Sequence, residues 1–392
     1  MSRPSALAGR PAAVVLQASG PNALGIVRSL GRAGVRVVAC DHDPRALGLL
    51  SRYATPAHTA DPVADPGGFV DDLLRVAERE PGAVLFATHD EAIAAIGPRE
   101  AEVDAVMRRP WSAWPAMRGI MDKGHQHAAA RAAGFPVPAT LTPADEADLA
   151  SVAAHLRFPV ILKPRDDAPG FRRRFHAQVL EAVDAEGLRA AWELAAAHRP
   201  QVSEVVPGDD SRLWTLGSYR DVAGRPLASF TGRKLRQWPP RFGTARAAES
   251  RWDPGLAARC HGLLDALGFH GISQVEVKRD DRDGRDYLIE VNPRSWLWVG
   301  LATSCGVNLP HACWLDAVGH PRTWPAGHRG GRRWMLAGKH LAGSVRELRR
   351  GEWSLQPFLS SLRPPISDGV IDPRDPRPAL ALYSRVARRR RG

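Results

Sequence analysis

The chain has 392 residues, 44% of them hydrophobic, and a formal net charge of +12. This length is too great for one ordinary hydrophobic core and suits two or three domains. No stretch of the sequence approaches the ~20 apolar residues of a membrane span, and the apolar run near the N-terminus is too short for a signal peptide. The four cysteines show no CxxC spacing, so we expect a cytoplasmic protein with reduced thiols.

The positive charge comes almost entirely from arginine, with 49 arginines against five lysines. Because Ala, Gly and Pro are also abundant, we attribute the arginines to compositional bias and expect no nucleic-acid partner. We expect the final "RVARRRRG" to be a solvated tail rather than a binding arm. Lysine is a compact point charge that suits phosphate oxygens in a tight site. The lysines that remain are therefore candidates for function: Lys123, Lys163, Lys234, Lys278 and Lys339.

Residues 12–118 alternate strand and helix patterns, which predicts a parallel sheet with crossover helices. The apolar run "AAVVL" is followed by "NALGIVRSLGRAG", which has Leu24, Val27 and Leu30 at helical spacing. The turn "ASGPNALG" between them is similar to a dinucleotide fingerprint but lacks the G-x-G-x-x-G spacing. A nicotinamide site is therefore not expected, although a helix N-terminus here could bind an anion.

Residues 119–318 continue with mixed helix and strand patterns. "MDKGHQHAAARAAG" predicts a helix ended by Gly134, and "FPVILKPRD" predicts a strand that ends at Lys163. Further strands are expected in "HAQVLEAV", "QVSEVVPG", "RLWTLGSYRD" and "RPLASFTGRKL", and helices in "AEGLRAAWELAAAH" and "GLAARCHGLLDALG". Residues 319–392 have weaker periodicity and form a basic C-terminal extension whose role the sequence does not indicate.

The segment "GISQVEVKRDDRDGRDYLIEVNPRSW" predicts a β-hairpin. A turn centred near Asp283 places Glu276 directly across from Glu290, roughly 4.5–5.5 Å apart at Cβ. Strict alternation places Tyr287, Ile289 and Val291 on the opposite face from Glu290. Two facing carboxylates repel unless a cation lies between them, and Mg²⁺ takes such ligands together with nucleotide phosphates. The alternative is a solvated sheet face with scattered charge.

Three lysines occupy the ends or edges of separate predicted elements and could converge on one polyanion: Lys123, Lys163 and Lys234. A nucleoside triphosphate fits this set of charges, with cations on the phosphates and carboxylates behind a bridging metal. The sequence contains no G-x-x-x-x-G-K-[ST] motif, so the site is not a P-loop.

Six motifs in order carry a family resemblance: "MDK", "FPVILKP", "SEVVPG", "FTGRKLRQWPP", "QVEVKRD" and "IEVNPR". Over residues 12–318 the sequence resembles the ATP-grasp superfamily, most of all its carboxylate–amine ligase and carbamoyl-phosphate-synthase-like branch. The resemblance implies a fold of α/β and α+β parts. A doubly wound pre-ATP-grasp domain (1–118) would precede two subdomains that clasp ATP, one on the lid side (119–205) and one that binds metal (206–318).

The resemblance also implies residue roles. Lys123 and Lys163 would contact the α- and β-phosphates, and Lys234 would reach the γ-phosphate side as a catalytic residue. The adenine and ribose would be read by Glu204, the backbone of Val205 and Val206, and Asp209 or Asp210. Mg²⁺ (or Mn²⁺) would be held by Glu276, Glu290 and Asn292. Arg294 would steady the acyl phosphate and its transition state.

Two features depart from the family pattern. The segment after Lys163, "RDDAPGFRRRFHAQ", has one glycine where the family has a glycine-rich loop. Its three arginines, Arg172 to Arg174, would bind either phosphate or a substrate carboxylate. The ribose position holds Asp rather than the more usual Glu. Simpler roles stay open for three residues, since Glu204 could cap a strand, Lys234 could be a surface lysine, and Arg294 could pair with Glu290.

The resemblance therefore predicts an ATP-dependent ligase that activates a substrate carboxylate as an acyl phosphate and joins it to an amine, releasing ADP and phosphate. The alternatives are a carboxylase or carbamoyl-phosphate-forming enzyme of the same fold, and a nucleotide-binding regulatory or scaffold protein without turnover. The expected partners are small-molecule carboxylates and amines, with neither nucleic acid nor membrane, and a homodimer is left open.

Overall fold

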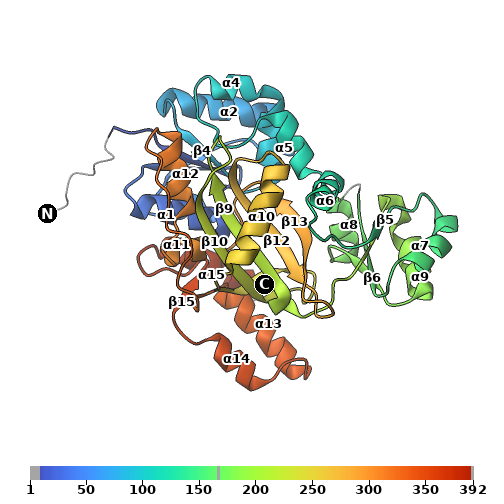
Figure 1. Cartoon of the computed structure of the whole chain (residues 1–392). Helices are drawn as coiled ribbons and strands as arrows, with labels where there is room; N and C mark the ends of the chain where they lie inside the picture. The colour runs from blue at the N-terminus through green and yellow to red at the C-terminus, as the bar shows by residue number, and fades with distance from the viewer. Residues whose placement is uncertain (1–8, 166–167, 390–392) are drawn as a thin grey trace.

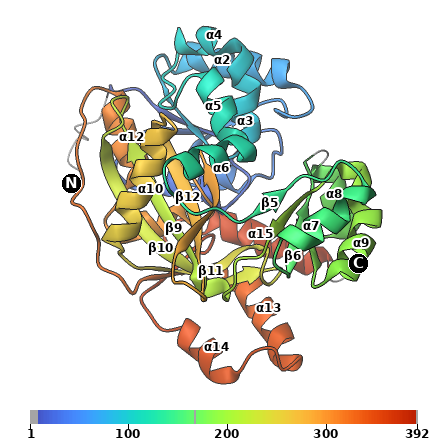
Figure 2. The same ribbon diagram turned by 45° about the vertical axis from the view of Figure 1, so that its right-hand side comes forward.

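The computed structural model describes residues 9–165 and 168–389 and contains three β-sheets (Figure 1). The sheets correspond to an N-terminal α/β unit, a small α+β unit and a large α+β unit. Figure 2 shows the N-terminal unit above the large sheet and the small unit beside it. The predicted fold class, α/β followed by α+β parts, is confirmed. None of the helices in the described part of the chain is long and apolar enough to cross a membrane.

The N-terminal sheet is parallel throughout, with strand order β3-β2-β1-β4. Its strands are β1 (Ala13–Leu16), β2 (Val37–Asp41), β3 (Thr55–His58) and β4 (Val84–Ala87), and the helices of this unit are α1 (Pro21–Arg32), α2 (Pro66–Arg79), α3 (Asp90–Ile96), α4 (Glu100–Asp104) and α5 (Trp114–Met121). Successive residues of β1 face opposite sides. Val14 belongs to the core that contains Phe69 of α2, and Val15 to the core that contains Leu24 of α1. Helices therefore cover both faces, as in the doubly wound arrangement that was predicted.

The small unit follows α6 (Lys123–Ala132) and contains an antiparallel sheet of order β5-β8-β6-β7. Its strands are β5 (Thr140–Leu141), β6 (Val160–Lys163), β7 (Leu180–Ala182) and β8 (Gln201–Glu204), and its helices are α7 (Leu149–His155), α8 (Ala168–Phe175) and α9 (Ala185–Ala195). The segment after Lys163 was expected to be a loop that binds either phosphate or a substrate carboxylate, but residues 168–175 of it form α8. Asp166 and Asp167 lie outside the described residues. Whether Arg172 to Arg174 bind phosphate or substrate stays a prediction.

The large sheet has the order β13-β12-β9-β10-β11-β14-β15. Its strands are β9 (Leu213–Arg220), β10 (Pro226–Trp238), β11 (Thr244–Ser250), β12 (Gly271–Arg279), β13 (Asp286–Asn292), β14 (Arg333–Met335) and β15 (Ile366–Asp368). The remaining helices are α10 (Pro254–Ala266), α11 (Val299–Ser304), α12 (Leu309–Ala317), α13 (Ala337–Arg349), α14 (Leu355–Ser361) and α15 (Arg377–Arg389). Residues 319–392 thus supply two strands of this sheet as well as three helices, so the basic extension is part of the fold.

The β12–β13 hairpin has the predicted register, with Glu276 opposite Glu290. A β-bulge follows at once, because Val277 pairs with Leu288 and leaves Ile289 without a partner on β12. The predicted alternation on β13 is therefore wrong at this point. Leu288 and Val291 lie in the core, whereas Ile289 lines a cavity next to Glu290.

Glycine allows the N-terminal unit to pack closely on the large unit. A Cβ atom on Gly25 of α1 would lie 2.9 Å from Val299 Cγ1 and 3.2 Å from the backbone N of Gly300 on α11. Gly25 belongs to the turn "ASGPNALG", which is similar to a dinucleotide fingerprint. The close packing of α1 on α11 explains why this position holds glycine. No nicotinamide site is needed to explain it.

The C-terminal end of the chain binds back onto the N-terminal unit. Asp375 is completely buried and accepts hydrogen bonds from Arg28 Nε (2.9 Å), Ser51 Oγ (2.8 Å) and the backbone N of Arg52 (2.9 Å). Arg28 also donates to the carbonyl oxygen of Val370. Residues more than 320 positions apart in the sequence therefore form one buried polar cluster that joins the two units.

Candidate active site

A cavity of about 540 Å³ lies where the three units meet. Asp90 of the N-terminal unit, Lys163 of the small unit and Glu276 of the large unit all contribute to its wall. Of the residues that the sequence nominated, all but Asp209 and Asp210 line the cavity: Lys123, Lys163, Glu204, Val205, Val206, Lys234, Glu276, Glu290, Asn292 and Arg294. Residues from β6, α6, β10, β12 and β13 are thus brought together as predicted.

Local structure places the three lysines. Lys123 is the first residue of α6, and the preceding Asp122 caps this helix by accepting a hydrogen bond from the backbone N of His125 (2.7 Å). Lys163 is the last residue of β6. Lys234 lies on β10 where the pairing with β11 becomes irregular. Each lysine therefore occupies an end or an irregularity of its element, where its side chain can point into the cavity.

Two of the lysines form ion pairs with the facing glutamates. Lys234 Nζ lies 2.8 Å from Glu276 Oε1, and both side chains are only 9% exposed. Lys123 Nζ lies 3.3 Å from Glu290 Oε2, and this pair is half-buried. Burial opposes the charge of Glu290, but Lys123 and Lys163 outweigh it and hold the pKa of Glu290 well below its usual range. Glu290 is thus a carboxylate at neutral pH.

Lys163 differs from the other two lysines because none of the described acidic side chains lies within ion-pair distance of it. Burial and the neighbouring charge of Lys123 lower the pKa of Lys163 to about 8. The pKa of Lys123 is raised instead, because the charge of Glu290 outweighs its burial. Lys163 is therefore a half-buried cation whose charge is incompletely compensated, as expected for a group that binds an anion.

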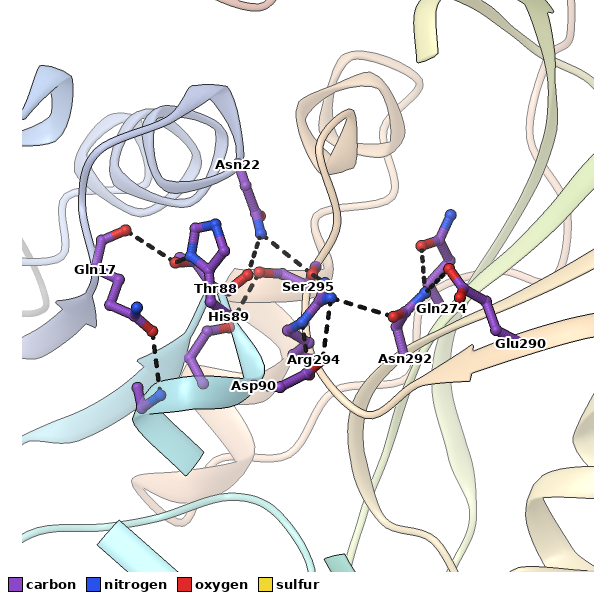
Figure 3. A network of polar contacts seen from close by, with 12 residues as sticks. Gln17, Asn22, Thr88, His89, Asp90, Gln274, Glu290, Asn292, Arg294 and Ser295 are labelled. Carbon is purple, nitrogen blue, oxygen red and sulfur yellow. Dashed lines mark hydrogen bonds and ion pairs between the residues drawn. The ribbon is translucent and has the colours of Figure 1, made fainter. Parts of the chain in front are cut away.

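The polar atoms around Glu290 fit a divalent cation. Asn292 Nδ2 donates to Glu290 Oε1 (3.0 Å) and to Gln274 Oε1 (3.2 Å), as Figure 3 shows. The ammonium groups of Lys123 and Lys234 neutralise the two glutamates, as a metal ion would. No group of three or more His, Cys, Asp or Glu side chains in residues 9–165 and 168–389 could hold a metal alone. A metal here would take two carboxylates and an amide oxygen, with phosphate and water oxygens as its other ligands.

Arg294 pairs with Asp90 of the N-terminal unit rather than with Glu290 (Figure 3). Its Nε donates to Asp90 Oδ1 (2.7 Å), and its Nη2 donates to Asn292 Oδ1 (3.2 Å). The guanidinium is thus held between a carboxylate from α3 and the amide beside the two glutamates. This contact joins the N-terminal unit to the end of the cavity where the metal ligands were predicted.

Glu204 and Val205 already have partners at the opposite end of the cavity. Glu204 accepts hydrogen bonds from the backbone N of Arg157 (2.9 Å) and from Arg157 Nη2 (3.1 Å). The backbone N of Val205 donates to the carbonyl oxygen of Pro159 (3.0 Å). The carbonyl of Val205 and the backbone of Val206 would then be the groups that read a base edge.

Asp209 and Asp210 lie behind the cavity wall. Asp209 caps the turn that follows it by accepting a hydrogen bond from the backbone N of Ser211 (2.8 Å). Asp210 is buried and accepts from the backbone N (2.8 Å) and the Nε2 (2.7 Å) of Gln237, a residue that does line the cavity. The predicted contact of Asp209 or Asp210 with the ribose would therefore either act through Gln237 or require a movement of residues 209–210 toward the cavity.

Lys278 also lines the cavity, and burial together with the charge of Arg241 lowers its pKa.

Sequence reasoning missed the contribution of the N-terminal unit. Asn22, His89 and Asp90 all line the cavity. Asn22 Nδ2 donates to the carbonyl oxygens of Thr88 (2.9 Å) and Ser295 (3.2 Å), while its buried Oδ1 has no hydrogen-bond partner among the described residues. Burial and the charge of Arg294 lower the pKa of His89. The sequence offered one indication of this contribution, the turn "ASGPNALG". It contains Asn22 and leads into the N-terminus of α1 at the cavity.

Comparisons with known proteins agree with this architecture. No protein-family model matches the chain. A D-aspartate ligase of Enterococcus faecium is 23% identical over 328 residues, which cover 78% of this chain and 76% of that protein. The solved structure of N5-carboxyaminoimidazole ribonucleotide synthetase in complex with ADP has a TM-score of 0.64 at 15% identity, covering 87% of this chain and 85% of that one. These similarities in sequence and fold point to the ATP-grasp superfamily.

A third relative supports the same ATP-grasp fold. An L-amino acid ligase from Bacillus licheniformis has a TM-score of 0.60 at 15% identity, covering 83% of this chain and 79% of that one. The superfamily assignment made from six short motifs is thus confirmed. In this ATP-grasp chain the cavity lies between the two α+β units, with α3 of the N-terminal unit closing one end through Asp90.

Proposed function

We propose that this chain is an ATP-dependent carboxylate–amine ligase. ATP would phosphorylate a substrate carboxylate to an acyl phosphate, and an amine would then displace phosphate to form an amide. The relatives named as ligases support this assignment, since one joins D-aspartate and another is an L-amino acid ligase by name. We therefore propose that at least one of the two substrates is an amino acid.

The observation that carries the proposal is the incompletely compensated charge of Lys163, which forms no ion pair with an acidic side chain of the described residues. An ammonium that is half-buried beside a second ammonium is unfavourable, and both burial and the charge of Lys123 lower the pKa of Lys163. The negatively charged oxygen atoms of a polyphosphate would offset this repulsion between the two ammonium groups. Lys123 and Lys234 lie on the same cavity wall and would contact the same polyanion, in exchange for part of their contact with Glu290 and Glu276.

The polar residues beside these lysines would act on the reacting group. Glu276, Glu290 and Asn292 would hold Mg²⁺ or Mn²⁺, which when bound neutralises phosphate oxygens during transfer. Arg294 would stabilise the charge that develops on the transferred group. Asp90 holds the guanidinium in position and Asn292 links it to the metal ligands, so little reorganisation would be needed as the reaction proceeds.

The test is an ADP-release screen over amino acids and small carboxylates, with hydroxylamine present to trap acyl phosphate as a hydroxamate. We expect ADP release that requires a carboxylate substrate, together with hydroxamate formation in the absence of an amine. ADP release that depends only on bicarbonate would favour the carboxylase alternative. Nucleotide binding without any ADP release across the screen would favour a regulatory protein.

A further inference from the structure

The charge of this protein is concentrated in its last segment. Residues 319–392 contain 16 arginines and lysines but only five aspartates and glutamates. They therefore carry nearly all of the net charge of +12, and the rest of the chain is close to neutral. A compositional bias that acted evenly on the whole sequence would not produce this distribution.

Most acidic side chains of this segment are used within the fold, so they do not offset the arginines on its surface. Glu347 forms a buried ion pair with Arg246, Asp372 pairs with Arg32, and Asp375 pairs with Arg28. In contrast, Arg346 and Arg349 on α13 are exposed, and no acidic side chain of the described residues pairs with either. The outward surface of this segment is therefore cationic.

Exposed apolar side chains are concentrated in the same segment. Of the 15 exposed large hydrophobic side chains in the described residues, nine lie between Leu341 and Val386. Leu341 (57% exposed) and Val345 (37%) are one turn apart on α13, and Leu355 (59%) and Leu359 (55%) are one turn apart on α14. We call residues 337–361, which form α13 and α14, the C-terminal hairpin. It projects from the lower edge of the molecule in both ribbon views (Figures 1 and 2).

The inner side of the C-terminal hairpin is tied to the large sheet. Besides the Glu347–Arg246 pair, the guanidinium of Arg236 on β10 lies 4.5 Å from the ring centroid of Trp353. Within the hairpin, His340 Nε2 lies 2.8 Å from Ser361 Oγ and joins α13 to α14. These contacts use side chains other than the exposed leucines. The leucines are therefore not needed to attach the hairpin and remain available to an external partner.

The combination of cationic and aliphatic side chains decides between three classes of partner. A nucleic acid would satisfy the arginines but gives exposed leucines nothing to pack against, since bases are bound by hydrogen bonds and aromatic stacking. A second copy would bury the leucines but would bring two strongly cationic surfaces together. An anionic lipid bilayer accepts apolar side chains below its headgroups and attracts arginines at its surface.

We propose that the C-terminal hairpin docks the protein onto anionic lipid surfaces. Leu341, Leu355 and Leu359 would enter the headgroup region, and Arg346 and Arg349 would contact lipid phosphates. The sequence argued against a membrane partner because it lacks a spanning segment, and adsorption of this kind requires none. The proposal does not depend on the ligase activity, because these residues lie outside the cavity.

The test is co-sedimentation of the full chain with vesicles of phosphatidylglycerol and phosphatidylcholine, compared with pure phosphatidylcholine. We expect binding to the mixed vesicles only, and a loss of at least about tenfold in partitioning for the double variant Leu355→Asp, Leu359→Asp. The matched control is Val183→Asp, Leu194→Asp. It adds the same two charges at exposed apolar positions of the small unit (69% and 49% exposed) and should retain binding.

Unchanged ATP-dependent ADP release and thermal midpoint in both double variants will show that the fold is intact. Equal loss in both variants would mean that total charge alone drives adsorption, which would overturn the proposal. Failure of the wild-type chain to bind mixed vesicles would do the same. A dimer in light scattering that Leu355→Asp, Leu359→Asp dissociates, without vesicle binding, would assign the hairpin to a second copy.

Discussion

Asp90 gives Arg294 a fixed position, and it does so from a different structural unit. The two residues are 204 positions apart in the sequence, and the Arg294 Nε to Asp90 Oδ1 distance is 2.7 Å. The sequence suggested either a catalytic Arg294 or an Arg294 that pairs with Glu290, and the carboxylate that it contacts is Asp90 rather than Glu290. A guanidinium that is held in advance loses less entropy when it meets developing negative charge.

Replacement of Asp90 by Asn should therefore affect the chemical step. The amide keeps the shape and one acceptor atom but removes the charge that holds the guanidinium. We expect kcat to fall at least about tenfold, equivalent to about 1.4 kcal/mol, while the KM for ATP and the thermal midpoint stay near wild type. The control is Asp71→Asn, which removes an exposed ion pair with Arg99 in the same unit. A defect in thermal stability alone would show that the pair is structural.

The pKa of Lys163 predicts a pH dependence of ATP affinity. In the ligand-free site this pKa is about 8, and phosphate oxygens should raise it toward the ordinary value of about 10.4. The complex would then hold more protons than the free protein above pH 8. We expect affinity to be constant below that pH and to fall by up to about tenfold per pH unit above it. Calorimetry between pH 7 and 9.5 measures this slope and the accompanying proton uptake.

Lys163→Arg is the matched variant for that measurement. Arginine stays protonated across this pH range, so the part of the slope that belongs to Lys163 should disappear. We also expect at least about tenfold weaker ATP binding at pH 7, because a planar guanidinium replaces a point charge. A wild-type slope in this variant would assign the titration to another group of the cavity, such as Lys278.

Glu290 tests the metal assignment. Glu290→Gln removes the carboxylate charge but keeps a side chain of the same length beside Asn292 and Lys123. We expect loss of Mg²⁺-dependent ADP release with an unchanged circular dichroism spectrum. The variant should also have a lower pKa at Lys123, because the charge of Glu290 raises it in the wild type. Full turnover in this variant, or in wild type treated with EDTA, would contradict the assignment.

The secondary-structure elements show what the sequence could predict and what it could not. The hairpin register was predictable because a short acidic turn and two alternating runs are local signals. The bulge at Ile289 was not, because an extra residue changes which side chains face the core without changing composition. The helix α8 was also missed, since a family pattern suggested a loop there. Asp90 and Asn22 reach the site only through the packing of one unit on another, which no local signal encodes.

Two helical glycines should respond to substitution in opposite ways, because Gly25 lies at the close contact of α1 with α11 and Gly262 on α10 faces open space. Gly25→Leu should lower the free energy of unfolding by about 1–3 kcal/mol, because Val299 and the backbone of Gly300 leave no room for a side chain. Gly262→Ala, in the middle of α10, should raise it by up to about 1 kcal/mol, since no atom outside its own helix turn lies within 4 Å of the added Cβ. Denaturant unfolding measures both. Similar values for the two variants would mean that α1 can shift away from α11.

At the scale of the whole molecule, the contacts that join the ATP-grasp core to the N-terminal unit include the α1–α11 contact, the Arg294–Asp90 pair and the buried cluster around Asp375. Asp375→Ala would leave Arg28 buried without its carboxylate. Breaking a buried pair in this way typically costs about 3–5 kcal/mol. We expect the N-terminal unit to lose protection from hydrogen exchange first, as measured by mass spectrometry. Uniform loss of protection over all three units would show that they unfold as one.

The position of Asp375 in the chain also bears on how the protein is made. Every residue that lines the cavity has been synthesised once the chain reaches position 298, yet the carboxylate that pairs with Arg28 comes 77 residues later. During translation Arg28 of the N-terminal unit therefore lacks its ion pair with Asp375 until the segment just before α15 has been synthesised. A chain truncated after residue 298 would contain every residue that lines the cavity. It would lack the Asp375 carboxylate that binds the N-terminal unit to the rest of the molecule. Attachment of the N-terminal unit through Arg28 and Asp375 is in this sense a late event of synthesis.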